Sequence, residues 1–160
     1  MKILEKKNKM DKKKRYSTHD EFLPKIPPKT ILTPHQKELE RLIGEWKNDY
    51  DKIEKVKAFS TKHDVIVVSK DAYTFVVYKE DIYINSTGNA GMATAGSGDV
   101  LSGLIAGLVA QGYDSLEASI LGVYLHGSAG DIYASKYDEN TLIASDIIEN
   151  FKEAFSLLKK

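Results

Sequence analysis

Four successive apolar residues, 65–68 (Val-Ile-Val-Val), constrain the fold of this chain more than any other feature. A strand with one face in water alternates polar and apolar residues, whereas an unbroken apolar run indicates burial on both faces. Such a strand needs other elements packed on each side of it. We therefore predict an interior strand at residues 65–68, of the parallel type found in α/β proteins.

Helical and strand patterns lie on both sides of this run, and they alternate as in α/β proteins. The other predicted elements are a short strand at 31–33, helices at about 39–44 and from about 49, a hairpin from runs at 73–78 and 81–84, and helices at 99–111, 116–135 and from about 145. Five helices with so few strands to cover indicate an α/β domain whose sheet is incomplete.

Composition excludes several classes of protein. Of 160 residues, 42% are hydrophobic and 29% charged, as in globular domains. Lysine plus arginine total 23, as do aspartate plus glutamate, so no overall charge favours nucleic acid. The absence of cysteine rules out disulfides and thiolate chemistry. No apolar run approaches the ~20 residues that span a bilayer, so we expect a cytoplasmic protein that binds neither nucleic acid nor membrane.

The N-terminal residues differ from the rest of the chain. From Lys6 to Arg15 there are seven basic residues and one acid, with no aromatic residue to stack on bases. Prolines 24, 27 and 28 then interrupt the chain. We therefore predict a basic, poorly ordered segment at residues 1–29 and a folded domain at 30–160.

A loop of small residues, 85–98, directly precedes the long apolar helix predicted from Asp99. The first N–H groups of a helix have no internal partner, and the helix dipole adds partial positive charge there. Because glycines let a phosphate approach this backbone closely, we predict an anion hole at Gly96, Ser97 and Gly98. Asp99 would then stand beside the bound phosphoryl group as a general base. On these residues alone, the alternative is an ordinary acid in a helix first turn.

Residues 87–103 resemble the nucleotide-binding signature of the ribokinase-like superfamily. Within it they are most similar to the ADP/ATP-dependent NAD(P)H-hydrate dehydratase family, whose pattern is roughly T-G-N-P-G-M-A-T-G-G-[ST]-G-D-V-L-[ST]-G. Other segments are similar to that family in the same order. They are residues 31–35 (I-L-T-P-H), 67–70 with Thr74, 122–131, and 144–147.

This resemblance covers about residues 28–155 and implies a ribokinase-like three-layer α/β/α fold, represented by its C-terminal part. It implies a lyase that repairs the S-epimer of NADH or NADPH hydrated at the C5–C6 bond. Asp99 would take the proton of the 6-hydroxyl as that oxygen attacks the terminal phosphoryl group of ADP or ATP, with Mg²⁺ on the phosphates. The anion hole would stabilise the transferring charge. Loss of phosphate, driven by the ring nitrogen, would restore the dihydronicotinamide.

The family positions also imply which residues bind ligands. His35, together with Asp99, would contact the hydrated dinucleotide. We interpret His126, on an apolar helix, as a core residue outside the site, and we predict no metal-ligating residue. The residues implied to bind the nucleotide are Lys70, Asp71, Ala72, Tyr73, Thr74, Asn85, Ser86, Thr87, Gly88, Asn89, Ala90, Gly91, Met92, Ala93, Thr94, Gly96, Ser97 and Gly98.

The chain departs from the family pattern in several places. Ala95 and Asp71 stand where the family has glycine, and Ala90 where it has proline. The N-terminal half of the family fold has no counterpart. We therefore expect an incomplete dehydratase, acting as a homo-oligomer or with the missing N-terminal half or an epimerase.

Two alternatives stay open, a ribokinase-like kinase of sugars or vitamins and an inactive nucleotide-binding fragment. The L-T-P-H segment and residues 92–94 favour the dehydratase over the kinase.

Overall fold

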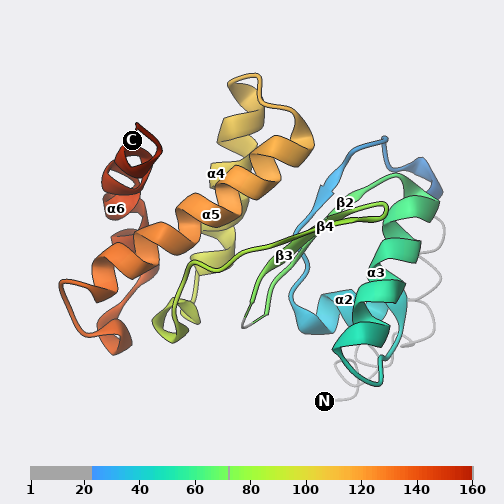
Figure 1. Ribbon diagram of the computed structural model, residues 1–160, viewed down its shortest axis with the longest axis horizontal. Helices are drawn as coiled ribbons and strands as arrows, with labels where there is room; N and C mark the ends of the chain where they lie inside the picture. Colours follow the sequence, from blue (N-terminus) through green and yellow to red (C-terminus); the bar gives the residue numbers. More distant parts are fainter. Residues whose placement is uncertain (1–22, 72, 160) are drawn as a thin grey trace, which may run out of the picture.

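A computed structural model describes residues 23–71 and 73–159 (Figure 1). This part of the chain forms one four-stranded sheet and five α-helices. In chain order the elements are η1 (Leu23–Lys25), β1 (Ile31–Leu32), α2 (Gln36–Ile43), α3 (Asp49–His63), β2 (Ile66–Ser69), β3 (Phe75–Tyr78), β4 (Asp81–Ile84), η2 (Ala90–Met92), α4 (Ser97–Ala110), α5 (Ser115–Ala134), η3 (Glu139–Thr141), α6 (Ala144–Ser156) and η4 (Leu157–Lys159), where η denotes a 3₁₀ helix.

The strands lie in the order β1-β2-β3-β4. Residues 65–68 are fully buried, which confirms the predicted interior strand. Its parallel character holds on one side only, because β1 runs parallel to β2 whereas β3 is antiparallel to it. The short connection between β2 and β3 accounts for this difference, because parallel neighbours need a crossover of a dozen or more residues and only five separate these strands. The predicted hairpin joins β3 to β4 through Lys79, whose φ of 56° suits a tight turn.

Helices cover both faces of the sheet, so the predicted three-layer α/β/α fold is confirmed (Figure 1). Val67 of β2 points into a core with α2 and α3, whereas Ile66 and Val68 point into a second core with α4 and α5. The unbroken apolar run is explained by these two cores. A third core joins α5 to α6, where Leu125 and Ile147 are fully buried.

α4 begins two residues before the predicted start at Asp99. Gly96, with a φ of 85°, is the N-cap, and Ser97 is the first helical residue. The apolar periodicity that predicted the helix starts only at Val100, so it could not indicate a first turn made of small residues. Asp99 is therefore the third residue of the helix and does not open it.

Glycines of α5 let the loop after β4 approach the helix closely. A β-carbon added at Gly127 would lie 2.2 Å from Thr87 Oγ1, and one added at Gly130 would lie 2.3 Å from Met92 Sδ. Larger side chains at these two positions would push the loop away. The small residues of α5 therefore set the position of residues 87–92.

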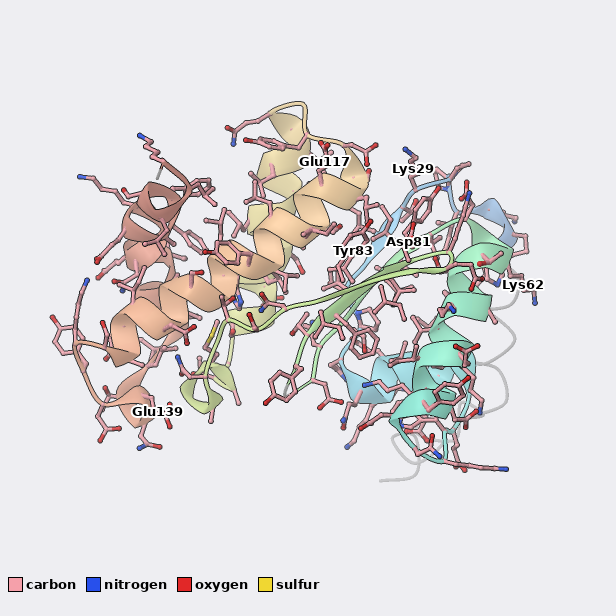
Figure 2. The ribbon with its side chains drawn as sticks, viewed as in Figure 1. Lys29, Lys62, Asp81, Tyr83, Glu117 and Glu139 are labelled. Atoms are coloured by element: carbon pink, nitrogen blue, oxygen red, sulfur yellow. The ribbon has the colours of Figure 1, made fainter. Side chains whose placement is uncertain are left out.

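The predicted basic segment, 1–29, lies outside the described residues as far as residue 22. Leu23 and Ile26 pack against the core formed with α2 and α3. Lys29 forms an ion pair with Asp114 at 2.9 Å, which links this segment to the start of α5. Figure 2 labels Lys29 and, in the first turn of α5, Glu117. The division at residue 30 stays a prediction. Within the described residues, no helix is long and apolar enough to cross a membrane.

Candidate functional site

A cleft of about 640 Å³ opens where the parallel strands β1 and β2 end. Ligands of α/β proteins commonly bind outside the carboxyl ends of parallel strands. The segments that follow these two strands, the loop after β4, and the helices α4 and α5 all contribute to its walls. The lining residues are His35, Lys70, Asp71, Tyr73, Thr74, Asn85, Thr87, Gly88, Asn89, Ala90, Met92, Ala93, Thr94, Ser97, Gly98, Leu101, Val123, His126 and Gly127.

Most of the residues predicted to bind nucleotide thus lie around one cleft, although they come from three separate parts of the chain. His35 lies there as well, at the N-cap of α2. Ser86, Gly91 and Gly96 do not line the cleft. Ala72 lies outside the described residues.

The first turn of α4 leaves two backbone N–H groups without a helical acceptor. The Ser97 N–H donates to the Thr94 carbonyl at 3.3 Å, and the Val100 N–H donates to the Gly96 carbonyl at 3.0 Å. Between them, the N–H groups of Gly98 and Asp99 have no carbonyl one turn earlier in the helix. These two groups, with the dipole of a 14-residue helix behind them, are suited to bind an anion.

Ala95 fits the turn although the family pattern has glycine there. Among the described residues, the non-glycine residues with positive φ are Lys29, Asp64 and Lys79. Ala95 therefore has an ordinary backbone conformation. The left-handed conformation that requires glycine belongs to the next residue, Gly96.

A positive charge lies over the same turn. A β-carbon added at Gly98 would lie 3.1 Å from Lys70 Nζ, so the ammonium group nearly touches the glycine. Lys70 follows β2 directly, and this places it at the carboxyl end of the interior strand. The ammonium and the free N–H groups together make this corner of the cleft favourable for phosphate.

The Asp71 carboxylate is balanced by a buried lysine. Lys52 Nζ lies 2.8 Å from Asp71 Oδ2, and Gln36 Nε2 donates to the same oxygen at 3.1 Å. Lys52 is only 2% exposed, and its ammonium lies 5.4 Å from the centre of the Trp46 ring and 5.1 Å from that of Phe75. The charge that replaces the family's glycine is therefore turned toward α3 and neutralised there.

Asp131 holds the loop on the other side of the cleft. Its carboxylate accepts the Gly88 N–H at 2.8 Å and the Asn89 side-chain amide at 3.1 Å. The Asn85 amide donates to the Thr87 carbonyl at 2.8 Å within the same loop. These bonds fix a segment of small residues that has few apolar contacts of its own.

His126 was interpreted from the sequence as a core residue outside the site, and the structure places it in the core beside the cleft. The ring is 9% exposed, yet it lines the cleft, and its Nε2 lies 3.0 Å from the Ser97 carbonyl oxygen. Burial lowers the pKa of His126 to about 4; the contact with Ser97 opposes this shift, and the Lys70 charge adds to it. Leu101, Val123 and Gly127 were also missed. The glycines at 122, 127 and 130 signalled a close approach to α5, but not which segment approaches.

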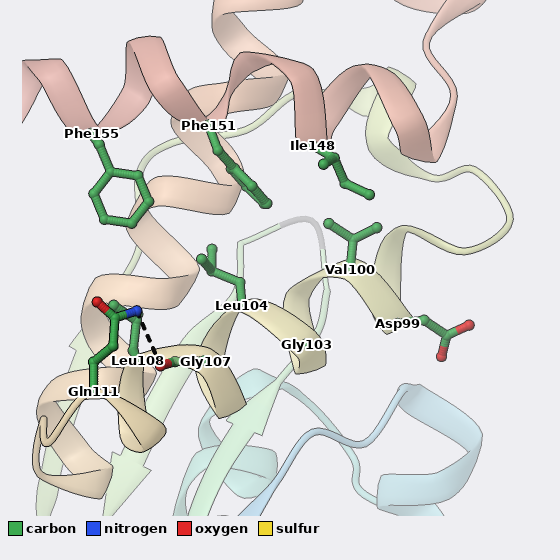
Figure 3. Close-up of a pocket in the computed structure, with 10 residues that line it drawn as sticks. All are labelled: Asp99, Val100, Gly103, Leu104, Gly107, Leu108, Gln111, Ile148, Phe151 and Phe155. Atoms are coloured by element: carbon green, nitrogen blue, oxygen red, sulfur yellow. Dashed lines mark hydrogen bonds between the residues drawn. The ribbon is translucent and has the colours of Figure 1, made fainter.

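Asp99 does not line this cleft. Its exposed carboxylate stands at the end of a neighbouring groove of about 580 Å³ between α4 and α6 (Figure 3). Apart from Asp99 and Gln111 the groove is apolar, with Phe151 and Phe155 on one wall and Gly103 on the other. Gly98 and Asp99 are adjacent, so the turn separates the cleft from the carboxylate. A group held in the cleft and a group outside it could therefore meet at this turn.

Within residues 23–71 and 73–159, no group of three or more His, Asp or Glu side chains could hold a metal ion. A sequence model of the NAD(P)H-hydrate dehydratase family matches residues 12–152 of the chain. The chain belongs to the NAD(P)H-hydrate dehydratase family. The match includes every residue discussed above as part of the cleft.

Relatives in this family are longer than the present chain. A bifunctional NAD(P)H-hydrate repair enzyme of Moorella thermoacetica is 42% identical over 122 residues, covering 74% of the chain and 23% of the relative. An ADP-dependent (S)-NAD(P)H-hydrate dehydratase of Neisseria meningitidis is 44% identical over 105 residues, covering 64% and 36%. The chain thus spans less than half the length of either relative.

The solved structures that match are also longer than the part this chain covers. The ADP/ATP-dependent NAD(P)H-hydrate dehydratase of Bacillus subtilis, co-crystallised with ATP and Mg²⁺, matches with a TM-score of 0.74 at 27% identity, covering 80% of this chain and 47% of that one. A hydroxyethylthiazole kinase of Pyrococcus horikoshii matches with a TM-score of 0.70 at 16% identity, and this likeness shows the fold alone. This chain therefore has the ribokinase-like fold.

Proposed function

We propose that this chain carries the nucleotide-binding part of a dehydratase that repairs hydrated NADH or NADPH with ADP or ATP as co-substrate. One observation carries the proposal. In a chain of the dehydratase family, the Lys70 ammonium lies beside Gly98, where the first turn of α4 leaves two N–H groups without a helical acceptor. An anion of phosphate chemistry is the ligand best suited to that corner.

The nucleotide would lie along the cleft with its terminal phosphate at the Gly98–Asp99 turn. Residues 70–74 would hold its AMP part, and the loop at 85–94 would wrap around it. The Asp131 bonds to this loop support that arrangement, because they preorganise the wall that the nucleotide would contact. ADP and ATP differ by one phosphate, and both would reach the turn through the same end of the cleft.

The reaction would take place on the far side of the turn, where Asp99 stands. The 6-hydroxyl of the hydrated ring would attack the terminal phosphoryl group, Asp99 would accept its proton, and the shortened nucleotide would leave. Loss of phosphate from C6, assisted by the ring nitrogen, with loss of a proton from C5, would restore the dihydronicotinamide. His35, which lines the cleft at its β1 end, would contact the dinucleotide.

Magnesium would arrive with the nucleotide. Mg²⁺ is usually held by substrate phosphates and one or two carboxylates, and keeps several waters. The described residues fit that mode, because they offer single carboxylates near the cleft and no cage of three or more ligands. When bound, the ion would neutralise phosphate charge. Lys70 would share that task at the turn.

The rest of the fold would cover one open side of the molecule. β1 is an edge strand, and a hollow of about 370 Å³ lies next to it around Leu32 and Arg41. Thr33, just after β1, contacts Ser102 of α4 at 3.1 Å, so this edge is continuous with the outer face of α4. There Gly103 has open space around it. We infer that the complementary half of the ribokinase-like fold adds strands to β1 and covers α4, because this chain matches only 48% of the Bacillus subtilis dehydratase.

The nucleotide site can be tested directly on this chain. ADP with Mg²⁺ should shift the backbone amide resonances of Gly98 and Asp99 in ¹⁵N spectra, and Lys70→Met should weaken the binding about tenfold, because one charge-assisted contact is lost. Lys62→Met, on the exposed end of α3, is the matched control and should change nothing. Saturable binding that moves other amides and leaves this turn unchanged would contradict the proposal.

A further inference from the structure

His126 joins two elements that are 29 residues apart. Its Nε2 lies 3.0 Å from the carbonyl oxygen of Ser97 and 3.4 Å from the Ser97 hydroxyl. A carbonyl oxygen can only accept a hydrogen bond, so the short contact requires that Nε2 carry the proton. The neutral ring then has Nδ1 without a proton, and this assigns the tautomer.

The ring stays neutral in this position. It is 9% exposed, and the pKa of His126 falls to about 4 because burial disfavours the charged form, a shift that the Ser97 contact opposes and the nearby Lys70 ammonium reinforces. A second positive charge is therefore absent at neutral pH. His126 acts at the turn as a single, directed N–H donor.

The turn lacks the usual support for the start of a helix. Helices usually begin with Ser, Thr, Asp or Asn, whose side chain accepts a backbone N–H. α4 begins with Gly96, which has no side chain and no capping bond. The other described α-helices, except α6, each have an N-cap side chain that accepts such a bond. At the start of α4, His126 instead donates to the carbonyl of the first helical residue, which leaves the N–H groups of the turn unused.

We propose that His126 is a positioning residue of the anion-binding turn, where its Nε2–H holds the Ser97 carbonyl so that the N–H groups of Gly98 and Asp99 face the cleft. The inference rests on the nucleotide site proposed above and adds a residue to it. His126 anchors the turn while its neighbour Gly127 admits Thr87 of the opposite loop, so one turn of α5 sets the spacing of the two walls.

Two isosteric substitutions separate the nitrogen atoms of the ring. In His126→Gln the side-chain amide can reach the place of Nε2, whereas in His126→Asn it reaches only that of Nδ1. We expect ADP·Mg²⁺ to bind His126→Gln within about threefold of wild type and His126→Asn about tenfold more weakly, as one hydrogen bond is lost. His63→Gln on α3 is the control and should bind like wild type.

The readout is titration calorimetry on the full chain, with each variant's unfolding midpoint measured separately. If both variants lose stability equally and bind ADP·Mg²⁺ like wild type once folded, His126 supports the fold only and the proposal is wrong. Equally weakened ADP·Mg²⁺ binding in both variants would also contradict the proposal, because it would show that a donor at the Nε2 position has no particular effect.

A second measurement needs no nucleotide. Long-range ¹H–¹⁵N spectra of the free chain report which imidazole nitrogen carries the proton, and we expect Nε2 in His126. An Nδ1–H tautomer would overturn the inference even if ADP binds at the turn. The two proposals can fail separately. If wild type does not bind ADP·Mg²⁺, but Nε2 carries the proton and His126→Asn alters the Gly98 amide shift, only the nucleotide site is contradicted.

Discussion

At the scale of single residues, the charge balance of the cleft depends on a side chain outside its lining. The Asp71 carboxylate would repel a nucleotide if it had no positive partner, but Lys52 and Gln36 both donate to it from outside the lining of the cleft. The two partners differ in exposure, with Lys52 at 2% and the Asp71 side chain at 33%. Removing Asp71 should therefore change the free energy of unfolding by a different amount from removing Lys52, and the two losses can be measured.

We expect Asp71→Gly to be more destabilising than Lys52→Met. The first leaves an ammonium buried without its carboxylate, which costs about 3–5 kcal/mol. The second leaves a partly exposed carboxylate that water can solvate, at a cost of about 1–2 kcal/mol. The double variant should recover most of the loss. Urea unfolding of all four proteins gives the coupling energy, and strictly additive losses would show that the pair is not coupled.

Asp99 is the residue whose substitution tests the chemistry. In an enzyme completed with the rest of the fold, Asp99→Asn should lower turnover of the hydrated dinucleotide roughly 10²–10⁴-fold, because the general base is lost. ADP affinity should change little, since the side chain lies outside the cleft.

The matched control is Asp146→Asn, another acid in the first turn of a helix, whose carboxylate accepts the Ile143 N–H at 2.9 Å. That variant should lose stability and keep its turnover per folded molecule. If ADP affinity falls with turnover in Asp99→Asn, Asp99 binds the nucleotide and is not the base.

At the scale of elements, the sequence predicted the helices and strands that have a regular pattern of apolar residues. The interior strand, the hairpin and all five helices within the described residues follow from apolar spacing and turn residues. The start of α4 and the place of His126 did not follow, because both depend on contacts between α4 and α5 that no local pattern encodes. The family resemblance selected the residues around the cleft, whereas the separation of Asp99 from them by the turn needed coordinates.

Glycine has opposite effects at two positions of α4, and this tests the geometry of the turn. Gly96→Ala should destabilise the chain by about 1–2 kcal/mol, because its φ is 85° and its new β-carbon would lie 3.2 Å from that of Ala144. Gly103→Ala should stabilise it by about 0.5–1 kcal/mol, because it lies inside the helix with open space around it. Thermal unfolding of both variants is the measurement. Equal effects would show that the turn at Gly96 is not held in the left-handed conformation.

At the scale of the whole molecule, the proposed site has two parts, the cleft within this chain and a part that the complementary half of the fold would supply. The cleft proposed to bind the nucleotide is formed within the chain, but Asp99 faces a groove with half-buried Phe151 and Phe155 and an edge strand nearby. An apolar groove continuous with an unpaired strand edge is a surface that protein chains usually cover. In the proposed reaction, the hydrated ring would approach Asp99 from that same side.

We therefore expect the isolated chain to have little or no dehydratase activity, although it binds ADP·Mg²⁺. Aiming the 6-hydroxyl at the phosphate needs groups from the rest of the fold, and orientation of this kind lowers a barrier by ~7–11 kcal/mol. The measurement is recovery of NADH absorbance from the hydrate with ADP or ATP, with the mass in solution determined alongside. Adding the part of the Bacillus subtilis dehydratase that this chain does not match, as a separate polypeptide, should form a complex and raise the rate.

The open side itself supplies the control for this experiment. Gly107→Glu would place a charge in the groove wall without touching the cleft, so it should block complex formation while ADP·Mg²⁺ binding stays unchanged. If the chain instead self-associates and Gly107→Glu abolishes this, the face is covered by a second copy of the chain and not by the complementary half. A monodisperse monomer of 17.9 kDa that turns over at an ordinary enzymatic rate would show that the chain completes the site by itself, and the inferred partner would be unnecessary.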